Sequence, residues 1–127
     1  MERLKVFIKY LKPYTRYRHA FEFRDESWLS NDVYELFRKV DMAICEADWP
    51  GMPQNIPITA SFVYMRRHGP ETEKDLYSGC YSKKYLKEDA RRIKDWLKKG
   101  KSIYVYFNND AGGWAIKNSL ELKKMLA

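Results

Sequence analysis

Polar side chains that could bind or transform a ligand follow four apolar stretches of this sequence, at the point where each stretch ends. In chain order they are Glu22, Arg24, Glu46, Asp48, Arg66, His68, Asn108 and Asn109. Carboxylates and a histidine can serve as general acids or bases or bind a metal ion, and guanidinium groups bind carboxylates or phosphates through paired hydrogen bonds. Glu22 and His68 are the candidate catalytic residues for a small anionic or phosphorylated ligand. The candidate ligand-binding residues at these four points are Arg24, Asp48, Arg66 and Asn108.

The same charges could instead neutralise one another. Glu22 with Arg66, or Arg24 with Asp48, would then be structural ion pairs, since paired charges perturb each other without catalysis. The sequence contains no HxH, HExxH or GxSxG pattern that would identify a metal site or an activated nucleophile. At this level the sequence names no metal or cofactor and leaves open whether the protein is an enzyme.

Strands that alternate with helices are needed to bring these side chains together. Apolar runs rich in aromatic and β-branched residues predict strands at 19–24, 42–47, 61–67 and 102–107. Apolar residues at helical spacing predict helices before the first strand and after the first, third and fourth, with Ser30 and Ser82 as N-caps. The alternation indicates a parallel sheet covered by helices on one side, with the loop 48–57 joining the second strand to the third.

Parallel strands place their carboxyl ends at one edge of a sheet, where ligands bind in α/β folds. The four polar ends therefore predict one polar mouth. Alternation along the third strand points Arg66 and His68 into this mouth with Asn108 and points Val63 and Met65 toward the helices.

The turn after the fourth strand, NNDAGG at 108–113, predicts a helix start that an anion could approach. Asp110 or Asn109 is placed to cap the last helix, and Gly112 and Gly113 would leave its first backbone N–H groups bare. Because Asp110 could already occupy the helix dipole, both capping alone and a ligand site with Asn109, Gly112 and Gly113 stay open.

The composition indicates one globular domain over residues 1–127 with a formal net charge of +7. Segment 83–101 holds nine lysines and arginines against three acidic residues, a pattern more typical of the solvated face of a helix than of a nucleic-acid site. Lysines interrupt the apolar residues of the first segment, which argues against a membrane span. Cys45 and Cys80 have no metal-ligand spacing and suit a reducing cytoplasm.

Four motifs, FEFRDESW, VYMRRHGP, YSGCYS and IYVYFNNDAGGWAIKN, together resemble the YecE-like family, a domain of unknown function with a TIM-barrel fold. The resemblance covers about residues 2 to 126 and departs at Arg67, where the family usually has an apolar residue. It places on family strand-end positions Glu22, Arg24, Trp28, Asp48, Arg66, His68, Gly69, Tyr77, Tyr81, Asn108 and Asn109.

The resemblance implies half of a TIM barrel, with four parallel strands and flanking helices, because a whole barrel has eight strands and about 250 residues. The matching part is the C-terminal half. An enzyme-like polar mouth is the first function that this implies. A non-catalytic half-barrel that pairs with itself as a homodimer, or with a partner half, is the alternative, because the two outer strands and the face carrying Phe62, Tyr64, Tyr104 and Tyr106 would lack cover. Nucleic-acid binding ranks third.

Overall fold

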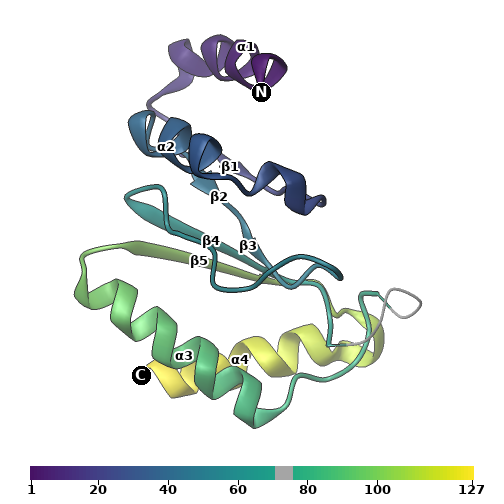
Figure 1. Cartoon of the computed structure of the whole chain (residues 1–127). Coiled ribbons are helices and arrows are strands. Elements are labelled where there is room, and N and C mark those ends of the chain that lie inside the picture. The colour runs from purple at the N-terminus through teal and green to yellow at the C-terminus, as the bar shows by residue number, and fades with distance from the viewer. Residues whose placement is uncertain (71–75) are drawn as a thin grey trace.

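Helices alternate with short parallel strands in the computed structural model, which describes residues 1–70 and 76–127 (Figure 1). The helices are α1 (Glu2–Leu11), α2 (Asn31–Lys39), α3 (Lys83–Lys98) and α4 (Trp114–Leu126). The strands are β1 (Ala20–Phe21), β2 (Ala43–Ile44), β3 (Glu46–Ala47), β4 (Phe62–Arg67) and β5 (Ser102–Phe107). Part of the predicted polar loop between β4 and α3, residues 71–75, lies outside the described residues.

All strand pairings in the described part of the chain are parallel, as the sequence predicted. β1 pairs with β2, and β3, β4 and β5 form a second sheet in that order. The predicted strand 42–47 is thus two short strands, because its first part pairs with β1 and its last part pairs with β4. The predicted strand 19–24 is shorter than expected and covers only Ala20–Phe21, whereas 61–67 and 102–107 agree with β4 and β5.

Two of the helices begin at the predicted serine caps. Ser30 Oγ accepts a hydrogen bond from the Val33 N–H before α2, and Ser82 Oγ accepts one from the Tyr85 N–H before α3. Each bond satisfies one of the backbone donors that a helix start leaves free. The predicted cap of α4 is wrong. Neither Asn109 nor Asp110 caps it with a side chain, and the helix begins after a 3₁₀ turn at Ala111–Gly113.

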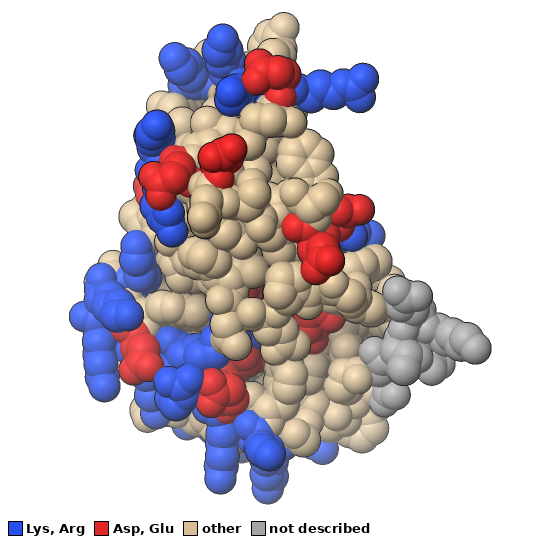
Figure 2. Space-filling view, in the orientation of Figure 1, with Lys and Arg blue, Asp and Glu red and all other residues tan. Residues whose placement is uncertain are grey.

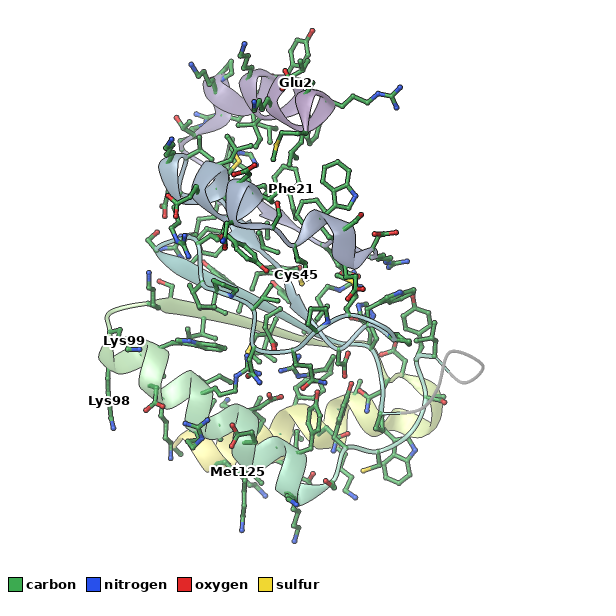
Figure 3. The ribbon with its side chains drawn as sticks, viewed as in Figure 1. Glu2, Phe21, Cys45, Lys98, Lys99 and Met125 are labelled. Atoms are coloured by element: carbon green, nitrogen blue, oxygen red, sulfur yellow. The ribbon has the colours of Figure 1, made fainter. Side chains whose placement is uncertain are left out.

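The helices bury apolar residues against the strands in two separate clusters (Figures 1 and 3). Near α1 and α2 the cluster contains Leu4, Ile8, Val33, Phe37, Met42 and Ile44, and Phe21 packs against it. Near α3 and α4 it contains Val63, Met65, Ala90, Ile93 and Leu122, with Met125 beside it. Val63 and Met65 therefore face the helices, as their alternation with Arg66 predicted.

A buried group of charges lies between β4 and α3. Arg67 is fully buried and donates from Nε and Nη2 to the two carboxylate oxygens of Asp89, at 2.7 and 2.6 Å. Its Nη2 is also 2.9 Å from Oε2 of Glu46, and the other oxygen of Glu46 is 2.8 Å from Nη2 of Arg92. Glu46 therefore does not join the predicted mouth. It faces α3, and ion pairs with two arginines hold its pKa below the usual range despite the opposing effect of burial.

The basic segment 83–101 forms α3 and the turn after it. Apart from the buried Arg92, its lysines and arginines lie over the outer surface of α3 and the turn after it, with acidic side chains among them (Figure 2). Arg91 pairs with Glu88 at 2.6 Å and with Asp95 at 3.3 Å. The interspersed acids favour a solvated helix face, so nucleic-acid binding stays the least supported reading.

Candidate functional site

Glu22 brings together side chains from the ends of β1 and β4. Its Oε2 accepts a hydrogen bond from Nη1 of Arg66 at 2.7 Å, and its Oε1 accepts one from Nε2 of His68 at 3.0 Å. Because an ionised carboxylate only accepts, Nε2 is the nitrogen of His68 that carries the proton in this contact. Arg66 also donates to Oδ1 of Asn108, from Nε at 3.3 Å and Nη2 at 3.2 Å. We call Glu22, Arg66, His68 and Asn108 the mouth cluster.

Parallel pairing explains why these residues meet. Arg66 lies opposite Tyr106 in the register of β4 and β5, so Asn108, two positions later, is on the same side just beyond the strand. Glu22 directly follows β1, whose partner β2 continues into β3 beside β4. The predicted convergence of Glu22, Arg66, His68 and Asn108 is what the structure shows.

The charge of Glu22 is balanced within the mouth cluster. Partial burial raises the pKa of this carboxyl, but the hydrogen bonds from His68 and Arg66 outweigh burial and lower the pKa to about 2. Arg66 is stabilised as a cation in return, since its pKa is raised by Glu22 against the opposing effect of burial. Glu22 is therefore an ionised acceptor at neutral pH.

His68 is fully buried behind Glu22 and held from several directions. Its backbone N–H donates to Oδ1 of Asp48 at 2.6 Å, and its ring meets the rings of Trp49 and Tyr77 edge-on at 5.2 and 5.6 Å. Its Nδ1 has no hydrogen-bond partner among the described residues. These contacts hold the ring beside Glu22.

Asp48 supports the backbone beside His68. The Tyr81 hydroxyl donates to Oδ2 of Asp48 and accepts a hydrogen bond from the Gly69 N–H at 2.6 Å. Burial raises the pKa of Asp48, although its bonds to Tyr81 and to the His68 N–H oppose that effect. No sequence motif distinguishes this structural role from ligand binding. Of the two ion pairs that the sequence left as an alternative, Glu22–Arg66 forms, whereas Arg24 pairs with Glu22 and not with Asp48.

The other predicted residues lie around the mouth cluster. Arg24 donates to Oε1 of Glu22 at 3.2 Å and stacks over the ring of Trp49, 3.9 Å from its centroid. Asn109 is fully buried, and its Nδ2 donates to the Gly79 carbonyl at 2.8 Å and to Oδ1 of Asn118 at 2.9 Å. Gly112 and Gly113, at φ of +68° and +75°, make the turn that leads into α4.

A cavity of about 450 Å³ opens beside the mouth cluster on the sheet face away from the helices. Strands and the segments next to them line it with Arg18, Ala20, Glu22, Cys45, Phe62, Tyr64, Arg66, Tyr104 and Tyr106. Burial raises the pKa of the Cys45 thiol to about 12, so this sulfur is not a thiolate nucleophile at neutral pH. Sequence reasoning missed Arg18, although it shares the alternation of Ala20 and Glu22.

Residues 1–70 and 76–127 contain no group of three histidine, cysteine, aspartate or glutamate side chains arranged to hold a metal ion. No helix in residues 1–70 or 76–127 has the length and apolar character to cross a lipid bilayer.

Comparison with known proteins gives the family. The model of a family described as "Protein of unknown function DUF72" matches residues 1–127. The crystal structure of a DUF72 family protein from Thermotoga maritima is similar to this chain with a TM-score of 0.77 and 30% identity, over 94% of this chain and 51% of that chain. Two crystal structures of a DUF72 family protein from Enterococcus faecalis show the same fold at 20% identity. Their TM-scores are 0.73 and 0.71, and the match covers 94% of this chain and 54% and 52% of theirs.

This chain spans about half the length of those solved structures. No curated protein matches it. The resemblance to the YecE-like family that the four sequence motifs carry is confirmed over the whole chain. The protein belongs to the DUF72 family, whose function is unknown.

Proposed function

We propose that the cavity beside the mouth cluster binds a small anionic or phosphorylated ligand. The convergence of Glu22, Arg66 and Asn108 from three strand ends beside one cavity carries this proposal. A cavity of about 450 Å³ falls in the range that holds small ligands, and ligand sites combine an apolar lining with a few converging polar groups. Arg66 uses three of its five N–H groups within the protein and keeps others for a ligand oxygen.

Acid–base chemistry in this site is assigned to Glu22, with His68 behind it. Glu22 lines the cavity and is ionised, so it can accept a hydrogen bond or a proton from a ligand group. A carboxylate with a pKa of about 2 is a weak base, and it would deprotonate only a group whose acidity the neighbouring guanidinium increases. His68 would hold the Glu22 carboxylate in place by donating from Nε2 to Oε1.

The remaining predicted residues differ in how directly they would contact the ligand. Arg24 and Asn108 complete the ligand-binding set at the rim, and Asp48 acts from behind by holding the His68 backbone. Contact between an anion and Asn109, Gly112 or Gly113 rests on their sequence position alone. Cys45 and Cys80 are both free thiols, and a reducing cytoplasm stays a prediction.

Calorimetric titration of the full chain with small phosphates and carboxylates tests the proposal. Arg66→Ala should abolish anion binding while the melting temperature changes little, since a part-exposed ion pair contributes only about 1 kcal/mol. Arg91→Ala, at an exposed ion pair on α3, is the matched control and should bind as the parent chain does. A large loss of stability in Arg66→Ala with binding intact would instead make the Glu22–Arg66 pair purely structural.

A half-barrel module is the second candidate, and the exposed tyrosines of β5 favour it. Tyr104 and Tyr106 are 37% and 49% exposed on the cavity face, and β1 and β5 are outer strands in the described sheets. The likeness to solved structures of about twice this length suits one half of a TIM barrel. A homodimer, or a partner half, would pair both outer strands. Phe62 does not support this candidate, because it is already buried within the chain.

A further inference from the structure

Arg18 stands at the end of the cavity away from the mouth cluster. Its guanidinium carbon lies 5.4 Å from the ring centroid of Phe62 and 5.6 Å from that of Tyr104. Phe62 begins β4 and Arg66 is near its end, so four residues of extended chain, about 13 Å, separate the two ends of the cavity. Both arginines line the same space.

The two arginines differ in how their charge is balanced. Arg66 pairs with Glu22, whose carboxylate also binds Arg24 and His68. Arg18 has no carboxylate partner among residues 1–70 and 76–127, and its one hydrogen bond there is from Nη1 to the Tyr104 hydroxyl at 2.6 Å. The rings and this hydroxyl hold the guanidinium in place and leave most of its N–H donors free. The unbalanced positive charge of the cavity is therefore at Arg18 and not at Arg66.

Tyrosine rings form the wall between the two ends. The rings of Tyr64 and Tyr106 stack with centroids 5.1 Å apart, and Tyr104 lies 6.5 Å from Tyr64. Flat aromatic surfaces of this kind favour a flat or apolar molecule, because they bury its faces and leave polar groups to be met at the ends.

We infer that the ligand is an amphiphilic organic anion, such as an aryl phosphate or aryl carboxylate, whose anionic group binds Arg18. Its flat body lies along Tyr64, Tyr104 and Tyr106, and its other end carries a hydroxyl or N–H group that donates to Glu22. This inference rests on the proposed ligand site and adds its polarity: the anion binds at the start of β4, and the group open to acid–base chemistry lies at the end of β4.

Phenyl phosphate and inorganic phosphate are the probes, titrated into the full chain and followed by calorimetry. Phenyl phosphate should bind at least about tenfold more tightly, since only it covers the tyrosine wall. Arg18→Gln should weaken phenyl phosphate about 10- to 100-fold by removing a charged hydrogen-bond donor. Arg16→Gln is the control, because Arg16 also stacks over a tyrosine, Tyr17 at 4.7 Å, but does not line this cavity.

Nuclear Overhauser contacts between the phenyl protons and the tyrosine rings supply a second readout. Contacts in the parent chain that disappear in Arg18→Gln, with an unchanged spectrum elsewhere, support the inference. Equal binding by Arg18→Gln and the parent, with binding lost in Arg66→Ala, overturns the Arg18 anchor and leaves the proposed site standing. If neither phenyl phosphate nor inorganic phosphate binds at millimolar concentration, both the Arg18 anchor and the proposed ligand site are overturned.

Discussion

Nη1 of Arg66 donates a hydrogen bond to the Glu22 carboxylate at 2.7 Å, although 44 positions separate the two residues in the sequence. Glu22 follows β1 and Arg66 is on β4, so this bond joins the two described sheets at their carboxyl ends. The second oxygen of Glu22 holds His68. One carboxylate thus organises the mouth and at the same time faces the cavity, so its substitution should alter both stability and binding.

The stability of the protein should fall as the pH drops from about 4.5 to about 2. A carboxyl with a lowered folded-state pKa contributes stability that is complete above its unfolded pKa and is lost as the pH falls through the folded value. For Glu22 these values are 4.5 and about 2. Asp48, whose pKa is raised, acts in the opposite direction and reduces the loss of stability at low pH.

Urea unfolding of the parent chain and of Glu22→Gln at pH values from about 2 to about 7 measures this effect. Glu22→Gln should be less stable than the parent at neutral pH, and the gap should close at the acid end. Glu35→Gln, which breaks an exposed pair with Arg38 on α2, is the control. A gap that stays constant over the whole range would mean that ionisation of Glu22 contributes nothing.

Arg67→Met should destabilise the protein by about 3–5 kcal/mol, because it leaves Asp89 and Glu46 buried with part of their countercharge removed. Arg91→Met, at an exposed ion pair on α3, should lower the stability by about 1 kcal/mol or less. Chemical denaturation of both variants at neutral pH gives the comparison. Equal losses of unfolding free energy in the two variants would show that the buried ion pairs of Arg67 contribute no more to stability than an exposed pair does.

Local sequence patterns were enough to predict much of the fold. Ser30 and Ser82 were identified as caps because a serine before an apolar helical pattern offers its hydroxyl to the first free N–H groups. Val63 and Met65 were assigned to the helix side by alternation alone. The cap of α4 was not predictable in this way, since Asn109 uses its side chain in bonds to Gly79 and Asn118, both distant in sequence.

The predicted position of Glu46 was wrong because the sequence does not give the register between neighbouring strands. Alternation along one strand shows which of its residues lie on the same face. It does not show which face of the sheet that is, because this depends on how the strand pairs with its neighbour. Glu46 pairs in register with Met65, so it lies on the helix side with Arg67. Arg67 stands where the family usually has an apolar residue. Its buried partners, Glu46 on β3 and Asp89 on α3, explain how the fold accommodates it.

Gly69→Ala should destabilise the protein more than Gly51→Ala does. Both glycines have positive φ, +131° and +76°, so each alanine carries a conformational cost of about 1–3 kcal/mol. At Gly69 the added Cβ would also lie 2.5 Å from the backbone oxygen of Ser78, whereas nothing lies within 4 Å at Gly51. Thermal unfolding of the two variants isolates the clash, and equal melting temperatures would show that the backbone near Ser78 yields freely.

The last prediction concerns association. The outer strands β1 and β5 leave backbone groups without a strand partner in the described part of the chain, and Tyr104 and Tyr106 are exposed beside them. Exposed strand edges next to apolar surface favour pairing with another chain. With β2 and β3 counted as one strand, two copies related by a two-fold axis would supply eight parallel strands and cover both edges. We therefore expect light scattering at micromolar concentration to give twice the chain mass of 15.3 kDa.

Substitutions on the cavity face separate this assembly from unspecific association. Tyr104→Glu and Tyr106→Glu should each shift the mass toward the monomer, because a carboxylate would be buried where the two sheets meet. Tyr10→Glu is the control, since Tyr10 is 73% exposed on α1, far from β5 in the fold (Figure 1). A monomer mass for the parent chain with an intact fold would contradict self-pairing, and the separate partner half would then be the assembly to seek.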